Sequence, residues 1–199
     1  MTIARHRLAL LPSIAAAMLV TAAPAFAAKA DAQTYQSLLQ SSSNGSKVAC
    51  GKDSYGNVAC TIDGEAVEVG DDCTSNLAFG GIANDKGTML QDNFRSAGAR
   101  PVAHVGKNQL VCLLASQRKE GELIRALVKV VPTATVKNCK GNDACKDADT
   151  HVEWKRPVSG TACTLKPDGH YAGDCATGWI DGKDLEEYSM GLKPEDTGA

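Results

Sequence analysis

Alternation of apolar and polar residues, together with turn signals, predicts β-strands over much of the chain. Between residues 47 and 69, apolar side chains are separated by the turn-forming pairs Gly56-Asn57 and Asp63-Gly64, which predicts a short meander. Two further apolar runs, at residues 101–105 and 109–115, are each followed by polar turns. The pattern therefore favours several short antiparallel strands over a helical protein.

The run at residues 123–131 alternates most clearly. Apolar Ile124 and Val128 face one way, while Arg125 and Lys129 face the other, as in a strand with one solvated face. A helix fits part of this run as well, but its β-branched content and the proline that follows favour a strand.

One helix is predicted at residues 88–97. Thr88 can cap its start, Leu90 and Phe94 share a face, and Gly98 can end it. Nearer the start, residues 28–46 are rich in Ala, Ser and Gln and are interpreted as a flexible leader.

The alternative for this leader is a short helix. Tyr35, Leu38 and Leu39 have helical spacing and would form one apolar stripe. At the other end of the chain, the polar, Gly- and Pro-containing residues 189–199 predict a disordered tail.

The first 27 residues have the pattern of a secretory signal peptide. Basic residues at 5–7 precede an apolar run, and Ala25-Phe26-Ala27 fits the small-x-small cleavage pattern. A transmembrane anchor is the alternative, but Pro12 and Pro24 interrupt the run. No other stretch is long enough to span a bilayer, so a periplasmic or secreted protein without a membrane span after cleavage is expected.

Composition and net charge limit the classes of partner expected for this chain. The 172 residues after the signal peptide carry 19 basic and 23 acidic side chains, which gives a net charge of −4. The basic patch that nucleic-acid binding requires is therefore not predicted. Aromatic residues make up only 5% of the chain, so covalent cross-links are expected to supplement the core.

Eight cysteines follow the expected cleavage site and predict four disulfides. Spacing slightly favours four pairs: Cys50 with Cys60, Cys73 with Cys112, Cys139 with Cys145, and Cys163 with Cys175. The rival set joins Cys60 to Cys73 and Cys50 to Cys112, because the segment 59–73 loosely repeats the hairpin pattern of 161–185.

These observations predict a mainly β protein built from two small disulfide-stapled units, with one or two short helices. The first unit is placed at residues 47–121 and the second at residues 122–188. The stretch 161–185 reads as a tight hairpin across Pro167-Asp168-Gly169 that leads into a final short strand.

The C-terminal residues resemble a bacterial SH3-like (SH3b) domain, a small and strongly bent β barrel. The residues that carry the resemblance are Pro157-Val158-Ser159-Gly160-Thr161, Asp168-Gly169-His170-Tyr171 and the closing Gly178-Trp179-Ile180 with Gly182 and Leu185. The resemblance implies an SH3-like barrel over 122–188 and a non-catalytic module that binds cell-wall peptides or an envelope protein. It implies Tyr171, Trp179 and Trp154 as binding residues. Their alternative role is core packing, because aromatic side chains of a small barrel usually lie inside.

No catalytic, metal-binding or cofactor site is predicted. The histidines at 104, 151 and 170 belong to no His-Glu-x-x-His pattern, and no Gly-x-Ser-x-Gly elbow is present. Cys139 and Cys145 lack the C-x-x-C spacing of redox and zinc sites. An acidic loop at residues 143–149 lacks the glycine and distal glutamate of a calcium-binding loop.

Two other functions fit the sequence. One is a periplasmic inhibitor or immunity protein against a secreted hydrolase, because small braced proteins lose little entropy on binding. Asp181 and Asp184 would then steer a basic partner. The other is a small secreted hydrolase that uses His151 or His170. The sequence does not define an oligomeric state.

Overall fold

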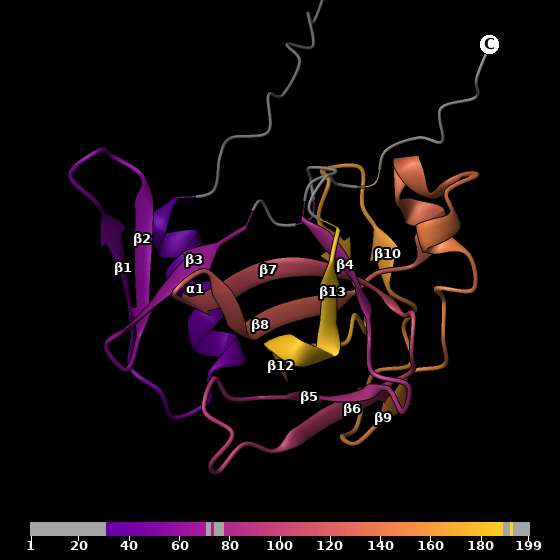
Figure 1. Ribbon diagram of the computed structural model, residues 1–199, viewed down its shortest axis with the longest axis horizontal. Coiled ribbons are helices and arrows are strands. Elements are labelled where there is room, and N and C mark those ends of the chain that lie inside the picture. Colours follow the sequence, from indigo (N-terminus) through magenta and orange to yellow (C-terminus); the bar gives the residue numbers. More distant parts are fainter. Residues whose placement is uncertain (1–30, 71–72, 74–77, 189–191, 193–199) are drawn as a thin grey trace, which may run out of the picture.

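The computed structural model describes residues 31–70, 73, 78–188 and 192 (Figure 1). The expected signal peptide at 1–27 lies outside these residues, as does the expected tail at 189–199 except for Leu192. Within the described part of the chain, no helix has the length and apolar character needed to cross a membrane.

The described part of the expected leader forms helix α1 (Ala32–Ser42). The Asp31 side chain accepts a hydrogen bond from the Thr34 amide at 2.8 Å, which satisfies one of the free N–H groups at the helix start. Tyr35 and Leu39 are buried against the sheet. The flexible-leader interpretation of 28–46 is therefore wrong for this helix, because its apolar stripe finds a surface to cover.

Thirteen strands are described. They are β1 (Val48–Lys52), β2 (Val58–Ile62), β3 (Glu65–Val69), β4 (Phe79–Ile82), β5 (Thr88–Gln91), β6 (Pro101–Val105), β7 (Leu110–Lys119), β8 (Glu122–Val130), β9 (Glu153–Trp154), β10 (Thr164–Leu165), β11 (Tyr171–Ala172), β12 (Thr177–Asp181) and β13 (Leu185–Glu187). Short 3₁₀ turns occupy η1 (Thr133–Thr135), η2 (Lys137–Cys139), η3 (Asp143–Cys145) and η4 (Gly182–Asp184).

Eleven strands join one antiparallel sheet in the order β1-β2-β3-β7-β8-β12-β5-β6-β9, and β4 and β13 pair beside this path. The expectation of two separate β units is wrong, because strands from both halves of the chain pair directly. The expected boundary at 121/122 falls in the turn of the long β7–β8 hairpin. Only β10 and β11 stand apart, as a two-stranded sheet.

The described strands form no closed barrel within 122–188, because the neighbours of β12 and β13 include strands from the first half. β12 pairs with β8 and β5, and β13 pairs with β4. Close approach requires glycine here: a Cβ on Gly178 would lie 2.9 Å from the Gln91 backbone, and one on Gly182 would lie 2.0 Å from the Leu123 oxygen.

The predicted helix at 88–97 is wrong. Residues Thr88–Gln91 form strand β5, which pairs with β6 and, at Gln91, with Trp179 of β12. A bent loop follows. The capping pattern at Thr88 is local, whereas the pairing partners on β6 and β12 lie outside the segment, and tertiary pairing outweighs weak helix propensity.

Both faces of the central sheet are covered. Trp179 and Leu127 belong to the core cluster that includes α1, whereas their neighbours Ile180 and Val128 belong to a second cluster. Adjacent strand residues point to opposite faces, so the two clusters lie on the two sides of the sheet. Arg125, expected on a solvated face, is 7% exposed and bonds Ser96 from the covering loop.

All eight cysteines are paired: Cys50–Cys60, Cys73–Cys112, Cys139–Cys145 and Cys163–Cys175. This set confirms the favoured spacing, and the rival pair Cys60–Cys73 is wrong. Four disulfides indicate an oxidising compartment outside the cytoplasm.

Candidate binding surface

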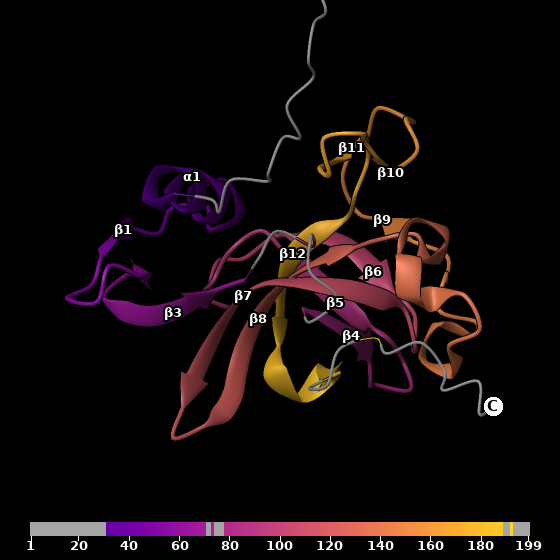
Figure 2. The same cartoon turned by 90° about the horizontal axis from the view of Figure 1, so that it is seen from above.

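A long excursion between the adjacent strands β8 and β12 contains a run of mostly exposed residues. It starts after Val130 and returns at Ala176, where the Val130 amide donates to the Ala176 oxygen at 2.8 Å. Figure 2 shows its β10–β11 hairpin standing away from the main sheet. The sequence of such a surface segment can change without disturbing the strands that carry it.

Interior contacts hold the base of the excursion. Buried Gln109 accepts hydrogen bonds from the Thr150 amide and hydroxyl, both at 2.8 Å. The Asp149 carboxylate accepts from the Thr133 amide at 2.9 Å and from its hydroxyl at 2.6 Å. The excursion is thus tied to the sheet and to itself before it reaches solvent.

Every residue from Lys155 to Asp168 is exposed except Cys163. Val158 and Leu165 are 42% and 41% exposed, which is unusual for large apolar side chains in this protein. Trp154, immediately before this run, is half-buried. Exposed apolar side chains mark binding surfaces where they form a contiguous patch.

Asp174 organises this exposed run. Its carboxylate accepts hydrogen bonds from the Ser159 amide at 3.2 Å, the Ser159 hydroxyl at 3.0 Å and the Gly160 amide at 2.6 Å. The Asp174 amide donates to the Thr161 oxygen at 2.8 Å, and the Cys163–Cys175 disulfide lies next to it. The run is therefore exposed but fixed.

The ionised form of Asp174 is favoured. Loss of solvent around the carboxylate opposes ionisation, but hydrogen bonds from Ser159 and Gly160 outweigh it and hold the pKa of Asp174 below its ordinary value. The turn at 159–161 is consequently built around a negative charge.

Two hollows meet at Asp174. An open one of about 550 Å³ is lined by Trp154, Arg156, Pro157, Val158, Ser159, Gly173, Asp174 and Cys175. A narrower slot of about 250 Å³ is lined by Gln109, Val130, Val131, Pro132, Asp149, Thr150, Val152, Cys163, Asp174 and Ala176. We call the two together the Asp174 surface.

The three aromatic residues expected to bind a ligand do not lie together. Trp179 is fully buried, donates its indole N–H to the Ser43 hydroxyl at 3.1 Å and packs edge-on against Phe94. Tyr171 bonds the Thr135 hydroxyl at 2.8 Å. Trp154 alone lines the open hollow, so only this residue is placed to meet a partner there.

The histidines are dispersed. His104, on β6, lies 2.9 Å from the Lys86 oxygen through Nε2, while His151 and His170 are exposed on other segments. Among the described residues, no three His, Cys, Asp or Glu side chains are arranged to hold a metal ion. The acidic side chains proposed to steer a partner are occupied in part: Asp184 accepts from Thr88, and Asp181 pairs with Arg125 at 3.4 Å.

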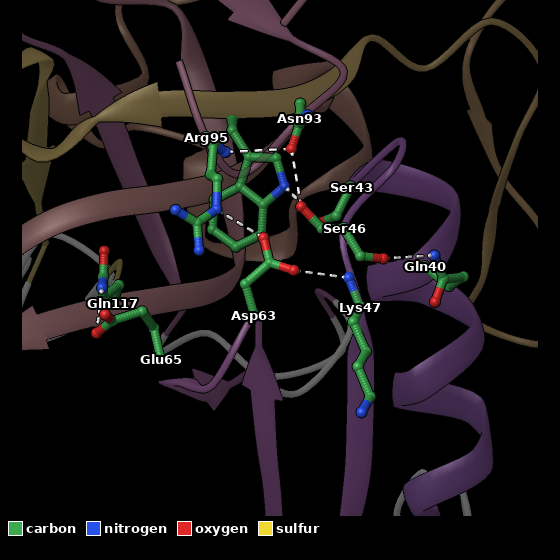
Figure 3. Close-up of polar contacts among 10 residues, drawn as sticks. Gln40, Ser43, Ser46, Lys47, Asp63, Glu65, Asn93, Arg95 and Gln117 are labelled. Carbon is green, nitrogen blue, oxygen red and sulfur yellow. Dashed lines mark hydrogen bonds and ion pairs between the residues drawn. The ribbon is translucent and has the colours of Figure 1, made fainter. Parts of the chain in front are cut away.

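A second polar cluster lies near α1 and has a structural role. In Figure 3, Asp63 accepts hydrogen bonds from the Lys47 amide at 2.8 Å and from Arg95 Nε at 2.7 Å. Asn93 accepts from the Ser46 hydroxyl and the Arg95 amide, both at 3.1 Å. The bond from Arg95, then that from Lys47, lowers the pKa of Asp63 to about 2. The cluster joins three loops with its polar groups directed at one another.

Comparisons with protein-family models, with curated proteins and with solved structures found no match to this chain.

Of the two carboxylates of the Asp174 surface, sequence reasoning missed Asp174 and named Asp149 only as part of the acidic loop at 143–149. The one local signal was the position of Asp174 beside Cys175, opposite the Ser159-Gly160 turn that the resemblance singled out. The role of Asp174 depends on the chain folding back over 14 to 15 residues, which a local pattern does not encode.

Proposed function

We propose that this chain is a non-catalytic, extracytoplasmic protein that binds a cell-wall peptide or an envelope protein through the Asp174 surface. The observation that carries the proposal is the exposed run 155–168, held in place by Asp174 beside a hollow lined by Trp154.

Rigidity and composition support this role. A loop already fixed in the free protein loses less conformational entropy when it binds. Tryptophan and arginine are enriched among the residues that contribute most to binding, and Trp154 and Arg156 line the same hollow. The expected signal peptide, the four disulfides and the exposed surface all support a partner outside the cytoplasm.

A relation to SH3-like domains forms part of the proposal, with its extent revised. The closing Gly178-Trp179-Ile180 motif lies on β12, turns through η4 and continues as β13. β12 of this bent segment pairs with β8 and β5, and β13 pairs with β4. Strand β7 in turn pairs with both β4 and β8. We propose that the SH3-like part spans β4 to β13, and that the excursion between β8 and β12 is an insertion that carries the binding surface.

The test is direct binding by two matched variants. Trp154→Ala removes the aromatic wall of the hollow, whereas Tyr55→Ala removes an aromatic that is 89% exposed at the tip of the β1–β2 hairpin. Wild type and Tyr55→Ala are expected to co-sediment with insoluble peptidoglycan or to retain an envelope partner, and Trp154→Ala is expected to lose at least tenfold in affinity.

Fluorescence gives a second reading of the same surface. The chain has two tryptophans, and Trp179 is fully buried, so quenching by an added soluble agent reports on Trp154. Protection of Trp154 by soluble muropeptides or by a purified partner would support the proposal. Unchanged quenching with both, together with no sedimentation, would refute it.

A specific observation also favours the inhibitor function. The β10–β11 hairpin projects from the body, is closed by Cys163–Cys175, and presents exposed Leu165 and Lys166 near its tip (Figure 2). Such a hairpin suits insertion into a concave enzyme site. Inhibition of purified muramidases or secreted proteases, lost in a Leu165→Asp variant and retained in Trp154→Ala, would favour this function over the first.

A further inference from the structure

The slot at the base of the Asp174 surface combines apolar walls with negative charge. Val131 and Ala176 are buried to 0% and 1% exposure, and Val130, Pro132 and Val152 complete the apolar lining. Asp149 and Asp174 are the charged residues of the lining. No lysine, arginine or histidine belongs to it.

The two carboxylates are held but not neutralised. Asp149 accepts two hydrogen bonds from Thr133, and Asp174 accepts three from Ser159 and Gly160, all from neutral donors. Among the ion pairs of the described residues, neither carboxylate takes part. A carboxylate offers about four acceptor positions, so both retain capacity for a further donor.

The volume limits the occupant. Sites for drug-sized ligands measure roughly 300–1,000 Å³, whereas the slot is about 250 Å³. The slot therefore suits one long side chain rather than a larger ligand. Lysine and arginine have an apolar stem that packs against apolar walls and a cationic end that remains at the polar mouth.

We infer that the slot binds the side chain of a lysine or arginine presented by the protein or peptide partner. This inference rests on the proposed function, because it names the chemistry that the Asp174 surface recognises. The stem packs against the partly exposed apolar lining at Pro132 and Val152, and the cation donates charge-assisted hydrogen bonds to Asp149 and Asp174. Such bonds are about twice as strong as those between neutral groups.

Trp154 is placed to contact the same partner beside the slot. Val152 lines the slot and Trp154 lines the open hollow, and residues two apart in an extended segment face the same side. A partner chain lying along this face would place a basic side chain in the slot while its neighbouring residues contact Trp154 and Val158.

Four blocked amino acids test the chemistry: the N-acetyl N-methylamides of arginine, lysine, citrulline and norleucine, titrated into the ¹⁵N-labelled full chain. The arginine and lysine probes are expected to shift the amide signals of Val131, Thr150 and Ala176 in a saturable way, and the other two probes are expected to bind at least fivefold more weakly. Equal binding by norleucine or citrulline would overturn the inference.

Three variants locate the site. Asp149→Asn is expected to weaken the arginine probe at least fivefold, while Asp168→Asn, which changes an exposed carboxylate outside the slot, is expected to leave it unchanged. Val152→Lys supplies a cation from within the slot and is expected to abolish binding. Retained binding in Val152→Lys, with a native spectrum elsewhere, would overturn the inference even where Asp149→Asn folds poorly.

The two proposals fail in different ways. If no probe shifts these amides while Trp154→Ala still abolishes partner binding, the proposed function stands. The inference that the slot binds a lysine or arginine side chain is then wrong. If the basic probes fill the slot but partner binding is indifferent to Trp154→Ala and Asp149→Asn, the slot chemistry stands and the proposed function is wrong.

Discussion

Two hairpins of this chain are each closed by one disulfide, yet they reach very different environments. The β1–β2 hairpin pairs over five residues on each strand, continues into β3 and carries buried Val48 and Ile62. The β10–β11 hairpin pairs over two residues on each strand, joins no other strand and exposes Leu165.

The comparison shows that a cross-link has a different role where packing is strong and where it is weak. In the first hairpin, Cys50–Cys60 adds to a sheet that hydrophobic burial already stabilises. In the second, the strands bury little apolar surface beyond Tyr171, so Cys163–Cys175 and the hydrogen bonds of Asp174 and Tyr171 hold the segment. The exposed surface is thereby tied to the body of the protein.

The largest effect is expected from the packed side of the comparison. Trp179→Ala removes a fully buried side chain that contacts Phe94 and bonds Ser43 next to the first hairpin. The free energy of unfolding should fall by about 3–5 kcal/mol, measured by urea denaturation. Trp154→Ala, the matched change on the exposed side, should cost far less, and equal losses would contradict the assignment of core and surface.

Removal of each disulfide distinguishes the two hairpins. The sequence separations of 10 and 12 residues are similar, so chain entropy predicts a similar effect, about 3 kcal/mol, for each. Hydrogen exchange should distinguish the two disulfides. The Cys50→Ser, Cys60→Ser double variant should lower amide protection by the same free energy across the whole sheet. Cys163→Ser with Cys175→Ser additionally opens the Lys166 amide, which donates to the His170 oxygen. The same pattern in both variants would contradict the comparison.

Acid should release the two carboxylate-centred turns. The folded pKa of Asp63 is lowered from 3.8 to about 2, so its stabilisation is complete above pH 3.8 and is lost as the pH falls toward 2. Asp174 also has a lowered pKa, so the 159–161 turn should likewise persist at neutral pH and weaken only on acidification. Amide shifts of Lys47 and Gly160 against pH check both, and loss of either bond above pH 5 would contradict this account.

Tyr55→Ala should have the smallest effect. Tyr55 is 89% exposed at the tip of the β1–β2 hairpin, so its removal should change the free energy of unfolding by less than about 0.5 kcal/mol. A larger change in thermal unfolding would contradict the placement of Tyr55 on the surface without packing contacts.

Local patterns predicted the strands well where neighbouring residues alone decide the outcome. The β-branched run at 123–131 became β8, and turn-flanking cysteines at 50 and 60 became cross-strand partners. The expected solvated face of β8 failed at Arg125, because a loop covers that face from a distant part of the sequence.

Long-range pairing explains the other failures. Residues 88–91 have a helix-capping pattern, but β6 pairs with all four of them, and Gln91 also pairs with Trp179 of β12, nearly ninety residues later. The same strand places Trp179 at a sheet centre, where Gly178 allows β5 to approach closely, so an aromatic expected to bind a ligand is used for packing. The carboxylates at 149 and 174 become one site only through folding.

The most direct test of this account is backbone ¹⁵N relaxation of residues 155–168 in the wild type and in Asp174→Asn. The account predicts order parameters of about 0.8 for Ser159, Gly160 and Thr161 in the wild type, close to rigid backbone, and values below about 0.6 in the variant. Values below about 0.6 in the wild type at neutral pH would contradict it, because the exposed surface would then be mobile before any partner binds.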